Sequence, residues 1–202
     1  MEERIVFATN NSGKIKEIKE ILADLEMEVV SMGDIGIHIT IEENAATYEE
    51  NAMIKAKAVA AHAKETDIVM ADDSGLEIDY LNGEPGVYSA RYLGENTSYR
   101  IKNKNLIERL SGVPENKRTA RFICAIAAVL PGGIELTTRG ILEGRIADKE
   151  RGNSGFGYDP IFYVPELFKS TAELSEEEKN EISHRGRALR AMKEELRKKK
   201  QR

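Results

Sequence analysis

Short apolar runs alternate with helical stripes in the first third of the chain, and this order constrains the fold more than any other feature. Residues 5–8, 29–30 and 68–71 are apolar runs that predict short strands. Between the first two runs, apolar residues recur on one helical face: Ile15, Ile18, Leu22 and Leu25. A second helix is predicted to start near Thr47, which has Glu50 at the spacing of a capping box. Strands alternating with helices predict right-handed crossovers and a partly parallel sheet.

The middle of the chain has a different pattern. A helix is predicted over residues 97–110, with these side chains buried: Ile101, Leu106, Ile107 and Leu110. Residues 121–130 and 134–139 flank Pro131-Gly132-Gly133, which predicts an antiparallel hairpin with a short turn.

The last fifty residues contain a glycine-rich loop, 152–160, followed by a strand-like run. Ser175 and Glu178 repeat the capping-box spacing, and Ser183 can cap a last helix. That helix is predicted to pack inward through Leu189, Met192 and Leu196. The sequence therefore predicts a mixed α/β fold, with an elongated central sheet flanked by helices.

Length, hydropathy and cysteine content indicate the cellular compartment of the protein. The length of 202 residues suits one sizeable domain, or two small lobes that share a core. No apolar stretch approaches the roughly 20 residues that span a bilayer. Residues 1–4 lead directly into a strand, so no secretory signal peptide is predicted. The single cysteine, Cys124, lies in an apolar run, where a packed core thiol is expected. We therefore predict a cytoplasmic protein without a membrane partner.

Charge argues against nucleic acid as a partner. The formal net charge is −5, whereas a long nucleic-acid footprint needs clustered excess Lys and Arg. The basic tail, residues 197–202, is the exception. A frayed helix end favoured by the helix dipole is the preferred interpretation of this tail, and a phosphate contact is the alternative.

Paired acids follow the third apolar run. Asp72 and Asp73 stand where residues 68–71 give way to Ser74-Gly75, which favours a turn. Isolated carboxylates are costly to bury, so a strand that ends in two acids is expected to point them into a crevice. Ligands bind at the carboxyl ends of strands in open α/β sheets. An active site near Asp73 and an ordinary solvated loop are equally favoured by this tetrapeptide alone.

The first loop, Thr9 to Lys14, has features of a phosphate site. It follows a strand and opens a helix, where backbone N–H groups and the dipole favour an anion. Lys14 adds a positive charge one turn into the helix, although the Walker A spacing is absent. When these residues are taken alone, a capped surface helix with an exposed lysine is slightly favoured over a phosphate site.

Glu49 and Glu50 lie at the start of the second predicted helix, where acids commonly complement the helix dipole. Glu43 precedes the capped turn of that helix, so the dipole explains Glu43 less well. Glu43 together with Asp73 would give a hard-oxygen site suited to Mg²⁺, which binds few protein carboxylates and takes substrate phosphates as further ligands.

Two further segments carry candidate binding residues. Phe156 stands between two glycines and can stack on a nucleobase or, equally, hold its loop onto the core. His184 and Arg185 place hydrogen-bond donors at the start of a helix, where they could bind a carbonyl or phosphate oxygen.

Taken together, six segments resemble the inosine triphosphate pyrophosphatase family, also called the Ham1-like family. They occur in family order over nearly the whole chain, and the closest resemblance is to the bacterial and archaeal enzymes for dITP, ITP and XTP. The segments are Thr9-Asn10-Asn11-Ser12-Gly13-Lys14, Glu50-Asn51-Ala52, Ala71-Asp72-Asp73-Ser74-Gly75-Leu76, Pro85-Gly86-Val87-Tyr88-Ser89-Ala90-Arg91, Gly155-Phe156-Gly157-Tyr158-Asp159-Pro160 and Ser183-His184-Arg185-Gly186.

The resemblance implies a Mg²⁺-dependent homodimer whose two lobes enclose a cleft, and which hydrolyses a purine nucleoside triphosphate to the monophosphate and pyrophosphate. It implies that Glu43 and Asp73 bind the metal and that Asp73 accepts a proton from the attacking water. The register of Glu43 rests on counting back from Glu50, since Glu42 is adjacent. The implied substrate contacts are Thr9, Asn10, Asn11, Ser12, Gly13, Lys14, Ser74, Phe156, Gly157, Tyr158, Asp159, Lys179, His184 and Arg185.

The mechanism follows as a hypothesis. Asp73, or Asp72 as the second choice, takes a proton from water that attacks the α-phosphorus. Donors from His184, Arg185 or the backbone suit the 6-oxo group of hypoxanthine or xanthine and repel the 6-amino group of adenine. A nucleotide-binding sensor without hydrolysis is the alternative of a different class. Paired acids near a lysine-bearing phosphate loop favour the enzyme.

Overall fold

The computed structural model describes residues 4–200, which divide into two compact units. Unit 1 contains the chain up to Asp73, the segment Cys124–Gly140 and the chain from His184 onward. Unit 2 contains Ser74–Ile123 and Ile141–Ser183. The cleft between two lobes stays a prediction.

The fold is mixed α/β, with a seven-stranded sheet flanked by helices, as the sequence predicts. The strand order is β2-β1-β3-β4-β5-β6-β7. Strand β1 pairs in parallel with β2 and β3, whereas β6 pairs antiparallel with β5 and β7. The strands are β1 Arg4–Phe7, β2 Glu28–Ser31, β3 Ile68–Ile78, β4 Thr119–Leu130, β5 Ile134–Ile146, β6 Phe162–Val164 and β7 Lys169–Ser170.

Residues 4–200 also form five α-helices and several short 3₁₀ turns, of which α4 and α5 follow the last strand. The helices are α1 Ser12–Leu22, α2 Tyr48–Ala60, α3 Tyr99–Arg109, α4 Glu176–Ile182 and α5 His184–Lys200. The 3₁₀ turns are Ala23–Leu25, Gly33–Ile35, Asp79–Leu81, Gly86–Arg91, Glu115–Lys117, Pro131–Gly133, Asp159–Ile161, Pro165–Leu167 and Thr171–Glu173. The predicted hairpin is confirmed, since β4 and β5 are sheet neighbours joined by Pro131–Gly133.

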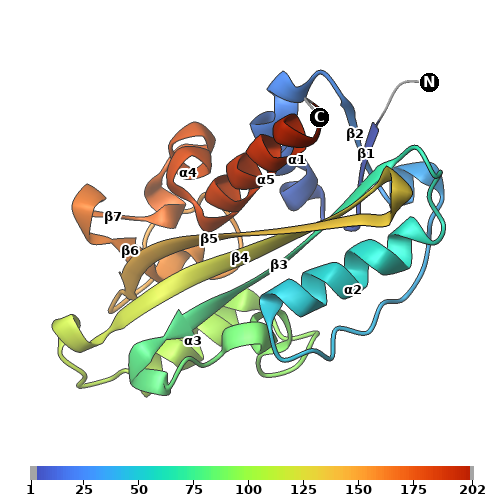
Figure 1. Ribbon diagram of the computed structural model, residues 1–202. Coiled ribbons are helices and arrows are strands. Elements are labelled where there is room, and N and C mark those ends of the chain that lie inside the picture. Colours follow the sequence, from blue (N-terminus) through green and yellow to red (C-terminus); the bar gives the residue numbers. More distant parts are fainter. Residues whose placement is uncertain (1–3, 201–202) are drawn as a thin grey trace. The chain divides into compact units, whose positions relative to one another are not determined.

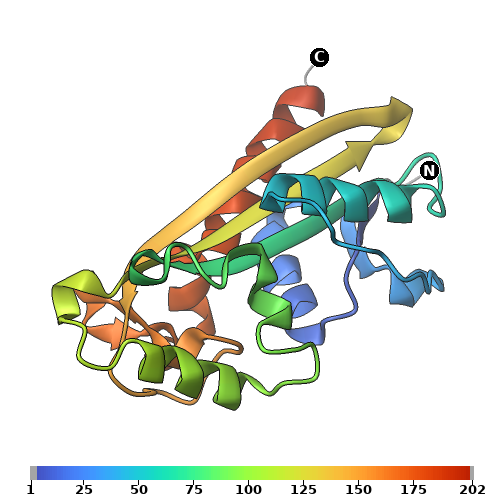
Figure 2. The same cartoon turned by 90° about the horizontal axis from the view of Figure 1, so that it is seen from below.

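Unit 1 has helices on both faces of its strands. Helices α1 and α5 lie on one face and α2 lies on the other (Figures 1 and 2). The core on the α1–α5 side contains the predicted helical stripes, including Ile18, Leu22, Leu189 and Met192. Cys124 is fully buried in this core, as predicted, and burial raises the pKa of its thiol to about 12.

Unit 2 packs its own core around the inward residues of β3, β4 and β6. Leu106 and Leu110 of the α3 segment belong to this core, as predicted. The prediction for Ile101 is wrong, because its side chain is 56% exposed. Lys102 and Asn103 are buried instead. The Lys102 ammonium and the Asn103 amide nitrogen find partners inside the unit, so hydrophobic periodicity alone misplaces the buried side of this helix.

The predicted turn at Ser74-Gly75 is also wrong. Strand β3 continues through both residues to Ile78, so Asp72 and Asp73 lie in mid-strand rather than at a strand end. Both acids are at least nine-tenths buried. A strand can hold them there because cations from distant segments compensate the charge.

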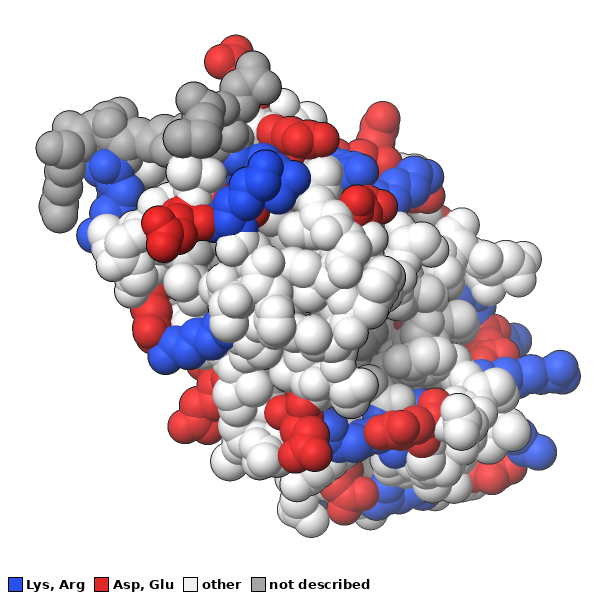
Figure 3. Space-filling view, turned by 90° about the vertical axis from the view of Figure 1, so that its right-hand side faces the viewer, with Lys and Arg blue, Asp and Glu red and all other residues white. Residues whose placement is uncertain are grey.

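The surface carries charges of both signs. On the face in Figure 3, basic and acidic side chains are interspersed around an uncharged area, so the described residues form no broad basic surface there. None of the helices within residues 4–200 combines the length and apolar character needed to cross a bilayer. Of the basic tail, residues up to Lys200 continue helix α5, and the last two lie outside the described residues.

Candidate active site

The first loop and the start of α1 form a fixed group of backbone donors in unit 1. Asn11 caps the helix by accepting a hydrogen bond from the Lys14 N–H at 3.1 Å. The Thr9 hydroxyl accepts one from the Asn11 N–H at 3.2 Å. No acidic side chain lies in the first turn of α1. This helix start therefore keeps the positive end of its dipole available to an anion.

Asp72 is the anionic anchor of this region. It is 2% exposed, and its carboxylate lies 3.0 Å from the Lys14 ammonium and 3.3 Å from the Arg185 guanidinium. Burial opposes ionisation, but the two cations outweigh it and hold the pKa of Asp72 well below its usual range. Asp72 therefore stays ionised and is a poor proton acceptor near neutral pH.

Arg185 connects α5 to Asp72 of β3 and to helix α1. Its guanidinium pairs with Glu17 of α1 as well as with Asp72. Burial opposes the charge, yet the two carboxylates raise the pKa of Arg185 further. The start of α5 is also held close to β5, because a Cβ on Gly140 would lie 2.1 Å from the His184 carbonyl oxygen.

Asp73 lies in a different environment from its neighbour. The Lys55 ammonium is 2.5 Å from Glu43 Oε2 and 3.7 Å from Asp73 Oδ1. Burial and the negative charges of Glu43 and Asp72 raise the pKa of Asp73, although Lys55 opposes this shift. Two adjacent carboxylates thus have pKa values moved in opposite directions, which is the pattern of an anchor beside a proton acceptor.

Asn51 and Lys55 belong to this group although sequence reasoning gave them no role. The Asn51 carboxamide accepts a hydrogen bond from the Ala45 N–H at 3.0 Å, and it also bonds to Asp73. It therefore ties the segment that carries Glu43 to strand β3. Their spacing in the sequence could have identified them, since Asn51 and Lys55 are four residues apart and therefore lie on one face of α2.

The two carboxylates fit the metal that the sequence predicts. Among residues 4–200, His, Cys, Asp and Glu side chains do not gather in threes that could hold a metal ion. Mg²⁺ commonly uses only one or two protein carboxylates and completes its shell with water and substrate phosphates. Glu43 and Asp73 both contact the single cation of Lys55, so their oxygens already surround one cationic position.

Unit 2 holds a second group of predicted site residues, in the glycine-rich loop. Asp159 Oδ2 accepts hydrogen bonds from the Phe156 N–H at 2.8 Å and from the Lys179 ammonium at 2.7 Å. Gly155 has a φ of +74°, and a Cβ there would lie 2.2 Å from the same oxygen. Only glycine allows this tight turn, which fixes the backbone on either side of Phe156.

Phe156 is partly exposed beside a cation. Its side chain is 39% exposed, and the Lys179 ammonium lies 4.6 Å from the ring centroid. Asn103 supports the loop by donating to the Gly157 carbonyl at 3.3 Å, and the Tyr158 hydroxyl donates to the Ser89 carbonyl at 2.7 Å. The ring of Phe156 is therefore presented from a braced loop.

The structure brings the predicted residues together in two sets. Unit 1 gathers Lys14, Asp72, Asp73, Glu43 and Arg185 around β3. Unit 2 gathers its members around the Asp159 carboxylate. Ser74 follows Asp73 directly in β3.

The comparisons identify the family. The model of the Ham1 family matches residues 5–195. The chain belongs to the Ham1 family. Among solved structures, a Ham1 protein from Staphylococcus aureus is 42% identical, with a TM-score of 0.86 over 98% of this chain and 100% of that one.

Members of the family with curated names are similar over nearly their whole length. A dITP/XTP pyrophosphatase from Clostridium perfringens is 48% identical over 198 residues, which cover 96% of this chain and 97% of the relative. One of the same name from Bacillus subtilis is 49% identical over 95% of this chain and 96% of the relative.

Proposed function

We propose that this protein is a house-cleaning nucleoside triphosphate pyrophosphatase that hydrolyses the deaminated purine nucleotides ITP, dITP and XTP to the monophosphate and pyrophosphate. The names of its Ham1 relatives support the substrate class. The contrast between Asp72 and Asp73 carries the proposal. One carboxylate is locked to Lys14 and Arg185, and its neighbour has a raised pKa beside Glu43.

In this proposal the unit 1 group binds the triphosphate. The N–H groups at the start of α1 and the Lys14 ammonium offer donors to phosphate oxygens. Asp72 orients the lysine, because the two groups are ion-paired without substrate. The phosphate contacts are Thr9, Asn10, Asn11, Ser12, Gly13 and Lys14.

Asp73 is the proposed proton acceptor. A carboxylate whose pKa is raised toward neutral pH is a stronger base for the attacking water than one held permanently ionised by cations. Glu43 and Asp73 would hold Mg²⁺, which supplies neutralisation of phosphate charge and polarisation of phosphate oxygens. Asn51 holds the Glu43 segment to Asp73, so the spacing of the two carboxylates is set before substrate binds.

Residues other than these are proposed to bind the purine ring of the substrate. Phe156 offers an aromatic face for stacking, and Lys179 lies over the same ring. His184 is the proposed donor to the 6-oxo group, a contact that the 6-amino group of ATP cannot accept. A hydrogen-bond mismatch of this kind discriminates by about 10⁴-fold. Substrate contacts of Ser74, Gly157, Tyr158, Asp159 and Arg185 stay part of the proposal.

A homodimer in the cytoplasm is the proposed form of the enzyme, with neither nucleic acid nor membrane as partner. The net charge of −5 and the mixed charges of the face in Figure 3 support the absence of nucleic acid.

The test is release of pyrophosphate from a panel of triphosphates at matched concentration, with and without Mg²⁺. The expected result is fast release from ITP, dITP and XTP, slow release from ATP and GTP, and none after chelation of the metal. Binding of ITP without release of pyrophosphate would instead identify a sensor.

A further inference from the structure

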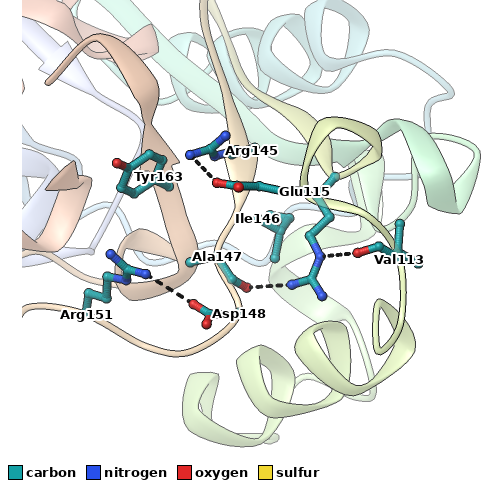
Figure 4. A pocket seen from close by; sticks show the side chains of 9 residues that line it. Val113, Glu115, Arg145, Ile146, Ala147, Asp148, Arg151 and Tyr163 are labelled. Carbon is teal, nitrogen blue, oxygen red and sulfur yellow. Dashed lines mark hydrogen bonds and ion pairs between the residues drawn. The ribbon is translucent and has the colours of Figure 1, made fainter. Parts of the chain in front are cut away.

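A pocket in unit 2 is lined by three arginines, two of which, Arg145 and Arg151, lie beside Tyr163 (Figure 4). Its volume is about 350 Å³, which lies within the range of small-molecule sites. The polar lining comes from Arg118, Arg145, Arg151 and Tyr163, with two acids at the edge. The proposed function uses none of these residues.

Strand pairing places two of the arginines. Arg145 on β5 pairs in register with Tyr163 on β6, and its guanidinium lies 4.6 Å from the ring centroid. The Arg151 guanidinium lies 5.5 Å from the same centroid. Attraction to one aromatic ring holds both cations at the pocket in spite of their mutual repulsion.

The third arginine is fixed by backbone groups. Arg118 donates hydrogen bonds to the carbonyls of Val113 at 3.0 Å, Leu110 at 2.9 Å and Ala147 at 3.5 Å. Within residues 4–200 it pairs with no carboxylate. Its position is therefore rigid, and its positive charge is not neutralised by the protein.

The carboxylates at the pocket compensate only part of the charge. Arg145 pairs with Glu115 and Arg151 with Asp148, but the acid side chains are 69% and 66% exposed. Exposed pairs of this kind contribute little and exchange readily with other anions. The Nε–H of Arg151 is buried and has no acceptor in the described part of the chain. Three guanidiniums thus face two replaceable carboxylates.

We propose that this pocket binds a phosphate-bearing small molecule as a second site. The planar guanidinium presents paired donors that match phosphate oxygens. A phosphate would replace the Asp148 carboxylate at the Arg151 guanidinium and neutralise the charge of Arg118. Free inorganic phosphates and nucleotides share this chemistry, and titration with each distinguishes them.

The test is a titration of backbone amide NMR signals with inorganic phosphate, pyrophosphate or a nucleoside monophosphate. The expected result is saturable shifts in residues 113–118 and 146–151, apart from any in residues 9–14 of the proposed active site. Tighter binding of pyrophosphate identifies a free polyphosphate as the ligand, and tighter binding of the monophosphate identifies a nucleotide. Absence of saturable shifts at the pocket overturns the proposal.

Three variants sharpen the test. Arg151→Gln should weaken binding at the pocket about ten-fold, as expected for loss of a charge-assisted hydrogen bond. Lys149→Gln, an exposed neighbour of equal charge, should change it less than about two-fold. Asp148→Asn removes the competing carboxylate and should tighten binding, a gain that a merely structural arginine cluster would not produce. Equal affinities in all three variants would refute the site.

Discussion

The Lys14 ammonium contacts both carboxylate oxygens of Asp72, at 3.1 Å from Oδ1 and 3.0 Å from Oδ2. The two residues are 58 positions apart in the sequence. Their contact joins helix α1, which follows the proposed phosphate-binding loop, to strand β3, which carries the proposed proton acceptor. We therefore propose separate roles for Asp72 and Asp73, and mutation of each residue tests them.

Asp73→Asn should lower turnover by about 10²- to 10⁴-fold, the usual effect of losing a general base. Stability should be kept or slightly increased, because burial already disfavours the charge of Asp73. Initial rates of pyrophosphate release and thermal unfolding measure the two effects. Retention of most of the activity would remove Asp73 from its assigned role.

Asp72→Asn should act mainly on stability. The buried Arg185 would lose one of its two carboxylates, a change that costs about 3 kcal/mol and lowers Tm by about 6–12 °C for a chain of this length. Asp24→Asn is the matched control, since the Asp24 side chain pairs with Lys193 and Arg197 but is itself 55% exposed. Equal shifts in Tm for the two variants would contradict the buried anchor.

Glu43→Gln and Glu42→Gln form a matched pair of adjacent substitutions. Glu43 contacts Lys55 beside Asp73, whereas Glu42 is exposed. We expect Glu43→Gln to raise the Mg²⁺ concentration for half-maximal activity about ten-fold or more, and Glu42→Gln to leave it unchanged. The reverse result would show that the acid carried over from the family is Glu42.

Phe156→Ala should raise KM for ITP about 5- to 150-fold with little change in kcat, because stacking on a base contributes about 1–3 kcal/mol. Phe168→Ala removes an aromatic ring that is 82% exposed and serves as the control. Equal kinetics for Phe156→Ala and the parent protein would mean that Phe156 only packs its loop against the core and does not stack on the substrate.

The loss of folding stability at acid pH should depend on the ion pair between Asp67 and Arg4. Burial raises the pKa of Asp67, but two bonds from the Arg4 guanidinium, at 2.9 and 3.0 Å, and one from the Lys64 N–H outweigh it and lower the pKa. The resulting stabilisation is complete above the unfolded-state pKa of about 4 and is lost as pH falls through the lower folded-state value.

Arg4→Gln should therefore cost about 1 kcal/mol at pH 7 and flatten the dependence of unfolding free energy on pH in the acid range. Urea unfolding between pH 2 and pH 7 measures both. An unchanged acid slope would mean that Asp67 is not held ionised by Arg4.

Local patterns were sufficient for much of the fold. Apolar spacing gave the parallel arrangement of β1, β2 and β3, because each run is short and is separated from the next by a helical stripe. Capping residues marked helix starts correctly at Thr47 and Ser175, since these hydroxyls act on backbone groups three residues away.

Long-range compensation could not be read from the sequence. The turn predicted after Asp73 failed because the cations that permit two acids in mid-strand come from positions 58 and 113 residues away from Asp72. Lys102 was missed for a similar reason, since its ammonium donates to the Ala90 carbonyl at 2.5 Å. A buried polar group becomes predictable only when its partner is known.

Cys124 makes the protein its own reporter of unfolding. The chain has one thiol, it lies at 0% exposure among β-strand residues, and its pKa of about 12 leaves almost no thiolate at neutral pH. An alkylating reagent can therefore label it only in molecules whose unit 1 core has opened. The labelling rate of the natural sequence, without an engineered probe, measures how often that core comes apart.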